Sequence, residues 1–268
     1  MKVLITGGTG TLGVALASKI KADEVVIFSR NEHNQVKMKK KFPDFTYVIG
    51  DVRDYKSIKY ASKGAHTIFH LASIKHVSVC EDQPMEALKT NVFGTANVIK
   101  AAQKNGCRLV NISTDKAENP SSFYGITKLM AERLIQKYGY MSMRSGNIFG
   151  SSGSVIPLFI DQIRKNNAIT LTNGNMTRFW ILAEDLADVL IKMSYGGTHL
   201  PKLKSYTMFQ VADAVKELYG DKETEIKEIG AKYGEKMNEF LYGESSSDCL
   251  STYEELIKMF KKWDLSLI

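Results

Sequence analysis

The chain has 268 residues, of which 44% are hydrophobic and 24% charged, and it is long enough for one large domain or a domain with a lobe. No apolar run approaches the roughly 20 residues of a membrane span, no signal peptide is evident, and the scattered cysteines and histidines show no disulfide or metal pattern, so we expect a cytoplasmic protein without metal. The formal net charge is +7, but the lysine run at 37–41 lacks interleaved aromatics, so we expect a solvated helix face and no nucleic-acid site.

Short apolar runs alternate with helical patterns through the first 150 residues. Buried parallel strands appear as such runs, and their alternation with helices predicts a parallel sheet covered on both faces. Right-handed crossovers then give a doubly wound, Rossmann-type α/β fold. The predicted strands are 3–5, 24–29, 45–51, 66–72, 108–114 and 140–147. The predicted helices are 11–22, 84–106 and 121–138.

After residue 150 apolar runs and helical patterns no longer alternate regularly. Amphipathic patterns predict helices at 154–166, 183–197, 207–220 and 251–263, with short strands at 168–173 and 224–229. We therefore expect residues 1–150 to form the Rossmann domain. Residues 151–268 are expected to form a smaller lobe over the C-terminal edge of the sheet, with the chain crossing between the two more than once.

A glycine-rich turn, "TGGTGTLG", stands directly between the first predicted strand and the first predicted helix. Glycine permits the tight turn and lets backbone amides approach a pyrophosphate, while the helix N-terminus adds partial positive charge. The alternative is a turn that needs glycine for its geometry only. The strand–turn–helix context favours a nicotinamide dinucleotide site, in which the expected contacts are Gly7, Gly10, Thr11, Leu12 and Gly13.

The end of the second predicted strand is where such folds recognise the adenosine ribose. An acid there accepts hydrogen bonds from the 2′-hydroxyl and selects NAD. This chain has Ser29 and Arg30 instead, and an arginine can pair with a 2′-phosphate that an acid would repel. NADP is therefore favoured, and Glu32 keeps NAD as the alternative.

Other cofactor contacts are expected where the neighbouring strands end. Asp51 and Val52 follow the third run at the place of the adenine, and the residues after the fourth run lie beside the nicotinamide half. The alternative for these positions is ordinary loop and core packing. The remaining expected contacts are Asn31, Gln35, Leu71, Ala72, Ser73 and Thr90.

Tyr124 and Lys128 are one helical turn apart and share a face. A charged Lys128 would lower the pKa of Tyr124, as would an oxidised nicotinamide ring, so that the tyrosine can take a proton from a sugar hydroxyl. Taken alone, this spacing is common by chance. Joined to the glycine turn and to Thr114 at the end of the fifth predicted strand, it predicts a catalytic pair.

With these motifs the chain resembles the extended short-chain dehydrogenases/reductases. Within them it is similar to the UDP-N-acetylglucosamine 4,6-dehydratases that invert C5, the first enzymes of pseudaminic acid and related deoxysugar pathways. Most of the chain takes part in the resemblance. The matching segments are "TGGTGTLG", "IFSRNE", "IGDVRD", "SIKHV", "KTNVFGTANVI", "STDKAENPSSFYGITK", "GNIFGSSGSVIPLF", "MTRFW", "GGTHLPKL" and "YGEKMNEFL".

The resemblance implies a role for each polar residue of "STDKAENPSSFYGITK". Tyr124 would deprotonate the sugar C4 hydroxyl, and Thr114 would hydrogen-bond its oxygen. Lys116 would remove the C5 proton, for which it must be neutral, with a pKa depressed by burial and nearby cations. Asp115, protonated, would donate to the departing C6 hydroxyl. Lys128 would stay charged, and a proton returned to C5 from the opposite face would invert that centre.

The resemblance also implies substrate contacts and a homo-oligomer. Lys75 and Ile148 would line the sugar pocket, and Asn147 would also stand near the cofactor. Arg178 would meet the diphosphate; its alternative is a surface ion pair. The family pattern "RPGEK" appears here as "KYGEK", in which Glu235 can still bind the uridine ribose, whereas Lys232 replaces the usual arginine and loses its bidentate fork.

Two other functions stay open. One is a nucleotide-sugar 4-epimerase or ketoreductase that uses only Tyr124 and Lys128. The other is a non-catalytic NADP-binding sensor. Ordinary epimerases of this fold lack the Asp115–Lys116 pair. Dehydratases that retain C5 carry glutamate at the place of Lys116 or methionine at the place of Tyr124, so this chain resembles the inverting type.

Overall fold

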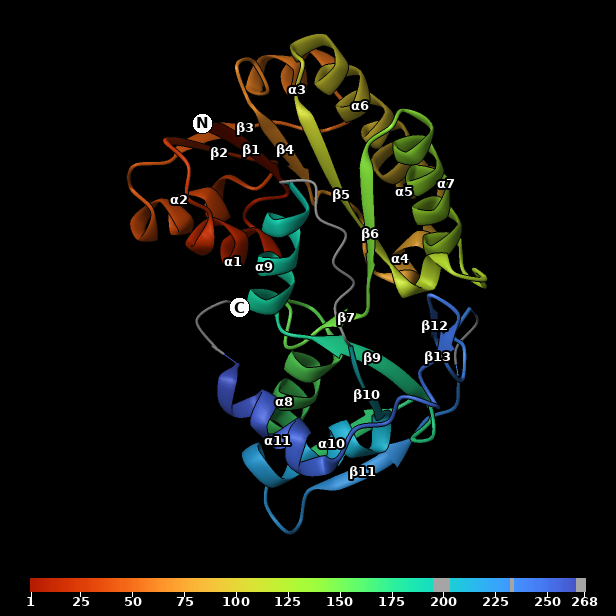
Figure 1. Ribbon diagram of the computed structural model, residues 1–268. Coiled ribbons are helices and arrows are strands. Elements are labelled where there is room, and N and C mark those ends of the chain that lie inside the picture. The colour runs from red at the N-terminus through yellow and green to blue at the C-terminus, as the bar shows by residue number, and fades with distance from the viewer. Residues whose placement is uncertain (195–202, 232–233, 264–268) are drawn as a thin grey trace.

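The computed structural model describes residues 1–194, 203–231 and 234–263. Its centre is a sheet of six parallel strands in the order β3-β2-β1-β4-β5-β6, which confirms the predicted doubly wound Rossmann-type fold (Figure 1). The strands are β1 (Lys2–Thr6), β2 (Glu24–Ser29), β3 (Thr46–Ile49), β4 (Thr67–His70), β5 (Arg108–Thr114) and β6 (Met141–Ser145).

Helices cover both faces of this sheet because its strands carry apolar side chains on both sides. Leu4 and Val26 pack on one face and Val3 and Ile27 on the other. Helices α3 (Tyr55–Ala61), α6 (Gly94–Asn105) and α7 (Phe123–Lys137) cover the first face, and α1 (Thr11–Lys19) and α9 (Ala183–Ser194) cover the second (Figure 1). Helix α2 (Glu32–Lys41), which carries the lysine run, packs beside β2 and β3.

The predicted helix at 84–106 differs from a regular α-helix. After α4 (Val77–Asp82), the chain forms α5 (Pro84–Ala87), a π-helical turn (Leu88–Phe93) and then α6. Within the π-helical turn, Asn91 accepts a hydrogen bond from the backbone N–H of Ile74 (2.8 Å) and donates one to the carbonyl of Ile74 (3.0 Å). The π turn therefore fixes the loop that follows β4, in keeping with the frequent occurrence of such turns at functional sites.

The chain leaves the large sheet at Gly146, so the predicted strand 140–147 divides into two. A Cβ at Gly146 would lie 2.6 Å from the carbonyl oxygen of Phe179, which excludes a side chain here. Beyond it, β7 (Asn147–Ile148) joins a three-stranded sheet with β9 (Thr177–Ile181) and β10 (Lys204–Thr207). Strands β9 and β10 were not predicted from the sequence.

The smaller lobe lies below the large sheet in Figure 1. Its core contains an aromatic cluster, in which the ring of Phe149 packs edge-to-face against Trp180, Phe260 and Trp263. Its other elements are α8 (Val155–Asn166), β8 (Ala168–Leu171), α10 (Met208–Tyr219), β11 (Glu225–Glu228), β12 (Phe240–Leu241), β13 (Glu244–Ser245) and α11 (Tyr253–Lys262).

After residue 150, helix α9 returns from the lobe to the core of the large sheet. Helix α9 packs against α1, and Lys19 Nζ donates to Asp188 Oδ2 at 2.6 Å between them. We propose the domain division at residue 150, with α9 as the segment that returns to the first domain. None of the helices within the described ranges is long and apolar enough to cross a membrane.

Candidate active site

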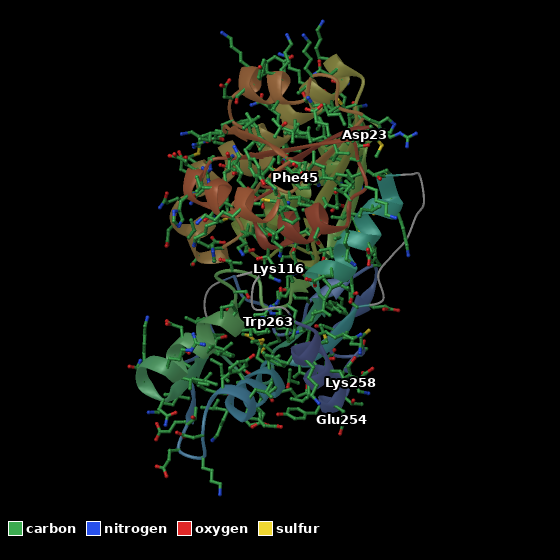
Figure 2. All side chains as sticks on the ribbon, turned by 90° about the vertical axis from the view of Figure 1, so that its left-hand side faces the viewer. Asp23, Phe45, Lys116, Glu254, Lys258 and Trp263 are labelled. Atoms are coloured by element: carbon green, nitrogen blue, oxygen red, sulfur yellow. The ribbon has the colours of Figure 1, made fainter. Side chains whose placement is uncertain are left out.

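One cavity of about 950 Å³ lies where the strand ends of the large sheet face the lobe, within the size range of small-molecule sites. Lys116 lies at this junction in Figure 2. Most of the predicted site residues line the cavity: Gly7, Gly10, Thr11, Leu12, Gly13, Ser29, Arg30, Asn31, Asp51, Val52, Leu71, Ala72, Ser73, Lys75, Thr90, Thr114, Lys116, Tyr124, Lys128, Asn147, Ile148 and Glu235.

The glycine turn forms a close-packed cradle at one end of the cavity. Gly7 has a φ of +67°, and a Cβ there would lie 2.8 Å from the backbone nitrogen of Ala72. A Cβ at Gly13 would lie 2.3 Å from the carbonyl oxygen of Gly8. Helix α1 begins directly after this turn, at Thr11. The backbone of the glycine turn therefore lines the cavity at the N-terminus of α1 with no glycine side chain between it and a ligand. This arrangement fits a bound pyrophosphate.

At the adenosine end, Arg30 and Asp51 stand together on the cavity wall. The Arg30 side chain is 57% exposed, with Nη1 3.8 Å from Asp51 Oδ2. Burial alone would raise the pKa of Asp51, but hydrogen bonds from Arg53 outweigh it and hold the pKa below its ordinary value. The adenosine end therefore offers the exposed Arg30 guanidinium to a ribose 2′-phosphate and the ionised Asp51 carboxylate to ribose hydroxyls.

Two predicted cofactor contacts lie outside the cavity. Glu32 is exposed at the first turn of α2. Gln35 is buried, and its amide Nε2 donates to the carbonyls of Ser29 (3.1 Å) and Val48 (2.9 Å). Because those bonds use the side chain to join β2 to β3, Gln35 supports the ribose loop from behind and does not line the cavity.

The predicted catalytic residues come together on two adjoining elements. Strand β5 ends at Thr114 and passes into a short 3₁₀ turn (Asp115–Ala117), and α7 brings Tyr124 and Lys128 to the same cavity. Asp115 lies beneath the surface with no exposed area, where its Oδ1 accepts hydrogen bonds from Thr114 Oγ1 (2.9 Å) and Lys116 Nζ (3.1 Å). An acid and a base are thus joined directly beside the tyrosine.

The charge state of Lys116 differs from our expectation of a depressed pKa. Burial favours the neutral amine, but the carboxyl groups of Asp115 and Glu239 outweigh it and raise the pKa of Lys116 above its ordinary value. The distances from its Nζ are 3.1 Å to Asp115 Oδ1 and 3.4 Å to Glu239 Oε1. Burial raises the pKa of Asp115, so this group holds a proton more readily than a free aspartate.

The expected effect of Lys128 on Tyr124 also needs correction. Burial raises the pKa of Tyr124 to about 12, and the cation that acts against this rise is Lys116. Lys128 donates from Nζ to the carbonyl of Ile112 at 2.7 Å, and burial lowers its pKa to about 8. The two lysines therefore have the reverse of the predicted order: Lys128 loses its proton more easily than usual, and Lys116 less easily.

Of the predicted substrate contacts Lys75 and Arg178, only Lys75 lines the cavity. Arg178 does not line the cavity and is no surface ion pair: it is buried, and its Nη1 donates to the carbonyls of Thr177 (2.8 Å) and Met237 (3.2 Å). Lys75 donates from Nζ to the carbonyl of Ser152, and burial lowers its pKa. Lys232 lies outside the described residues.

Comparison with known proteins identifies the family. A family model described as "Polysaccharide biosynthesis protein" matches residues 3–260. The chain belongs to this family.

Relatives of this polysaccharide biosynthesis protein include a UDP-glucose 4-epimerase of Rickettsia canadensis (strain McKiel), 38% identical over 277 residues that cover 95% of this chain and 80% of the relative. A UDP-glucose 4-epimerase of Rickettsia akari (strain Hartford) is 39% identical over 262 residues, or 89% of this chain and 76% of the relative.

Among solved structures, Pen from Bacillus thuringiensis has a TM-score of 0.92 at 32% identity, covering 100% of this chain and 98% of that chain. DesIV, a dTDP-glucose 4,6-dehydratase from Streptomyces venezuelae with NAD and TYD bound, has a TM-score of 0.79 at 21% identity and full coverage of both chains. At that identity the likeness to DesIV concerns the fold.

In this member of the polysaccharide biosynthesis family, sequence reasoning missed part of the site. The glycine- and serine-rich segment after the sixth predicted strand offered a signal, since Ser151, Gly153 and Ser154 line the cavity. Trp180, which lines the cavity, and Glu239, which lies beside Lys116, stand within the matching segments "MTRFW" and "YGEKMNEFL", but neither was singled out there. Among the described residues, no three His, Cys, Asp or Glu side chains are grouped so as to hold a metal ion.

Proposed function

We propose that this protein is a nucleotide-sugar 4,6-dehydratase that converts UDP-N-acetylglucosamine to a UDP-2-acetamido-2,6-dideoxy-4-keto-hexose with inversion at C5. The observation that carries the proposal is the joined Asp115–Lys116 pair, in which Lys116 lines the same cavity as Tyr124 and the buried Asp115 lies directly behind it. Oxidation at C4 alone needs one proton acceptor. Elimination of water across C5 and C6 needs an additional base and an additional acid, and this turn supplies both.

The first step needs a group that takes the C4 hydroxyl proton. Tyr124 faces the cavity; burial raises its pKa to about 12, and the Lys116 cation and a hydrogen bond with Thr114 act against that rise. A nicotinamide dinucleotide held by the glycine turn and Arg30 would supply the hydride acceptor for oxidation at C4 and the hydride for reduction at C6. Thr114 stands beside the tyrosine, where its hydroxyl can hold the C4 oxygen while the 4-ketone forms.

The second step needs a neutral amine and a protonated carboxyl group. One proton transfer from Lys116 Nζ to Asp115, across the 3.1 Å hydrogen bond, creates both at once. The raised pKa of the Asp115 carboxyl favours its protonated form. Lys116 then takes the C5 proton, and Asp115 gives its proton to the C6 hydroxyl, which leaves as water. The pair returns to its ionised state. When hydride is returned to C6, a proton added to C5 from the opposite face completes the product with inversion, and it balances the proton that Tyr124 took from the C4 hydroxyl.

The cofactor and substrate classes are supported by the fit of the cavity and by the related proteins. The Gly7 cradle and Arg30 support a nicotinamide dinucleotide, with NADP preferred for the charge of Arg30 and NAD as the alternative. The relatives are described as UDP-glucose 4-epimerases, which supports a UDP-sugar as substrate. The other predicted cofactor and substrate contacts that line the cavity, and a homo-oligomeric assembly, belong to the same proposal.

The decisive experiment is NMR of the product formed from UDP-N-acetylglucosamine in heavy water. We expect a 6-deoxy-4-keto sugar of the L-arabino configuration, with deuterium at C5. In Lys116→Ala we expect slow reduction of bound NADP without exchange at C5, whereas Lys137→Ala, which changes an exposed lysine on α7, behaves as the unaltered enzyme. Full C5 exchange in Lys116→Ala would remove Lys116 from its role.

A second candidate is a UDP-sugar 4-epimerase, favoured by the descriptions of the relatives. It would use only Tyr124 and Lys128 with the cofactor, because epimerisation at C4 breaks no bond at C5 or C6. The same NMR experiment separates the two. A 4-epimer with an intact C6 hydroxyl and no deuterium at C5 establishes the epimerase and excludes the dehydratase.

A further inference from the structure

Glu239 is a buried carboxyl group that the reaction described above does not use. It immediately precedes β12 and is 2% exposed. Its Oε1 lies 3.4 Å from Lys116 Nζ, and its Oε2 lies 3.4 Å from Lys236 Nζ. A carboxyl group is almost never this deeply buried without a charged partner. Its position between two lysines, one of which is the proposed base, therefore calls for an explanation.

The backbone holds Glu239 firmly in this place. Its N–H donates to Ser246 Oγ at 2.9 Å, and the N–H of Ser246 donates to its carbonyl at 2.8 Å. Ser246 Oγ also lies 2.6 Å from Thr177 Oγ1 at the start of β9. The backbone of Glu239 is thus anchored to the lobe sheet independently of Lys116.

The same segment, residues 234–246, grips the turn that carries the catalytic pair. The Glu118 carboxylate accepts hydrogen bonds from the N–H groups of Tyr242 (2.8 Å) and Gly243 (3.1 Å). Lys236 Nζ donates to the carbonyl of Glu118 at 2.8 Å. Because Glu118 directly follows the 3₁₀ turn, these bonds set the distance between Glu239 and Lys116. The segment also contains Glu235, which lines the cavity.

The charges around Lys116 come from four parts of the chain. The groups that act on Lys116 or Glu239 are Asp115 on the same turn, Tyr124 on α7, Arg178 on β9, and Lys236 beside Glu239. Burial alone would raise the pKa of Glu239, but Lys116, Arg178 and Lys236 outweigh it and lower the pKa. Glu239 is therefore ionised and presents its negative charge to the Lys116 ammonium group.

We infer that Glu239 is a positioning residue that competes with Asp115 for the Lys116 ammonium group and so sets the pH range in which Lys116 acts as a base. The inference rests on the proposed function for its role in the reaction. Transfer of the proton from Lys116 to Asp115 leaves Glu239 facing a neutral amine, so the attraction between Glu239 and the Lys116 ammonium group, 3.4 Å apart, opposes loss of the proton from Lys116. The charge of Glu239 also raises the pKa of Asp115, the acceptor of that proton. Lys236 attracts the same carboxylate and weakens this opposition.

The test measures how readily Lys116 loses its proton, without any sugar substrate. The full-length protein is labelled with trace acetic anhydride across a pH series, and mass spectrometry of the peptide that contains Lys116 gives its acylation midpoint. In Glu239→Gln we expect the midpoint to fall and labelling at neutral pH to accelerate roughly threefold to tenfold, because a close opposite charge has been removed. In Lys236→Met we expect the opposite, a higher midpoint and slower labelling.

The opposite signs separate an electrostatic role from general damage, which would expose Lys116 in both variants alike. Glu244→Gln is the matched control: it makes the same substitution at an exposed carboxylate in the same segment and leaves the midpoint unchanged. A midpoint that stays or rises in Glu239→Gln overturns the inference, as does a shift of the same sign in Glu239→Gln and Lys236→Met.

Activity then supplies a second readout. The rising limb of C5 proton exchange against pH moves to lower pH in Glu239→Gln, since more of Lys116 is neutral at each pH. An unmoved limb overturns the role of Glu239 in the reaction. Failure of the proposed function is recognised separately, because the unaltered protein then makes no 4-keto sugar although the acylation midpoint of Lys116 still shifts in the two variants.

Discussion

We expect the replacement of Lys128 by methionine to stabilise the protein at neutral pH although it removes a residue of the proposed site. The amine is buried, and its pKa is lowered from 10.5 to about 8. At pH 7 the folded protein must therefore keep a proton on a group that binds it more weakly than the unfolded chain does. The cost is about 3 kcal/mol, from 2.5 pKa units at about 1.4 kcal/mol each.

The sign of the pH dependence follows from the same shift. Between about pH 8 and pH 10.5 the unfolded chain binds more protons at Lys128 than the folded protein, so the free energy of unfolding rises with pH there. By pH 9.5 the unaltered protein regains about 2 kcal/mol. The variant also loses the hydrogen bond to the carbonyl of Ile112, which offsets about 1–2 kcal/mol of its gain.

The assay is urea unfolding of both proteins at pH 7 and at pH 9.5. We expect Lys128→Met to be more stable by roughly 1–2 kcal/mol at pH 7 and to lose this advantage at pH 9.5. Lys137→Met, at the exposed end of the same helix, shows no such change with pH. A difference between Lys128→Met and the unaltered protein that is the same at both pH values would refute the assignment of a buried, weakly basic amine.

Three further predictions concern the sheet, the cofactor and the catalytic turn. Burial lowers the pKa of His70 to about 3, so stability is lost as pH falls below about 6.5, by about 2 kcal/mol at pH 5, and urea unfolding of His70→Gln is expected to show a smaller loss. Arg30→Ala is expected to weaken NADP binding about tenfold with little change for NAD, measured by calorimetry; equal losses for both contradict a 2′-phosphate contact. Gly125→Ala places a Cβ 2.2 Å from the carbonyl oxygen of Lys116, so we expect a loss of C5 exchange with retained circular dichroism, and unchanged exchange argues against a rigid turn.

Several features of the fold were predictable because their causes are local. The glycine turn before α1 and the Tyr124–Lys128 spacing on α7 each depend on neighbouring residues. The apolar runs of β1 to β6 are visible because both faces of the large sheet are buried. By contrast, β9 and β10 carry polar side chains at several positions and are defined by partners far along the chain, so no periodic pattern marked them.

The sequence by itself determined which chemical groups the site contains and that they share one edge of a parallel sheet. Only the tertiary structure decided their charge states. Lys116 meets Glu239 because a segment more than a hundred positions away folds against its turn, whereas Lys128 forms no salt bridge within the described part of the chain and donates to a backbone carbonyl. A pKa depends on burial and on charges within a few ångströms, and those distances exist only once the distant segments have packed together.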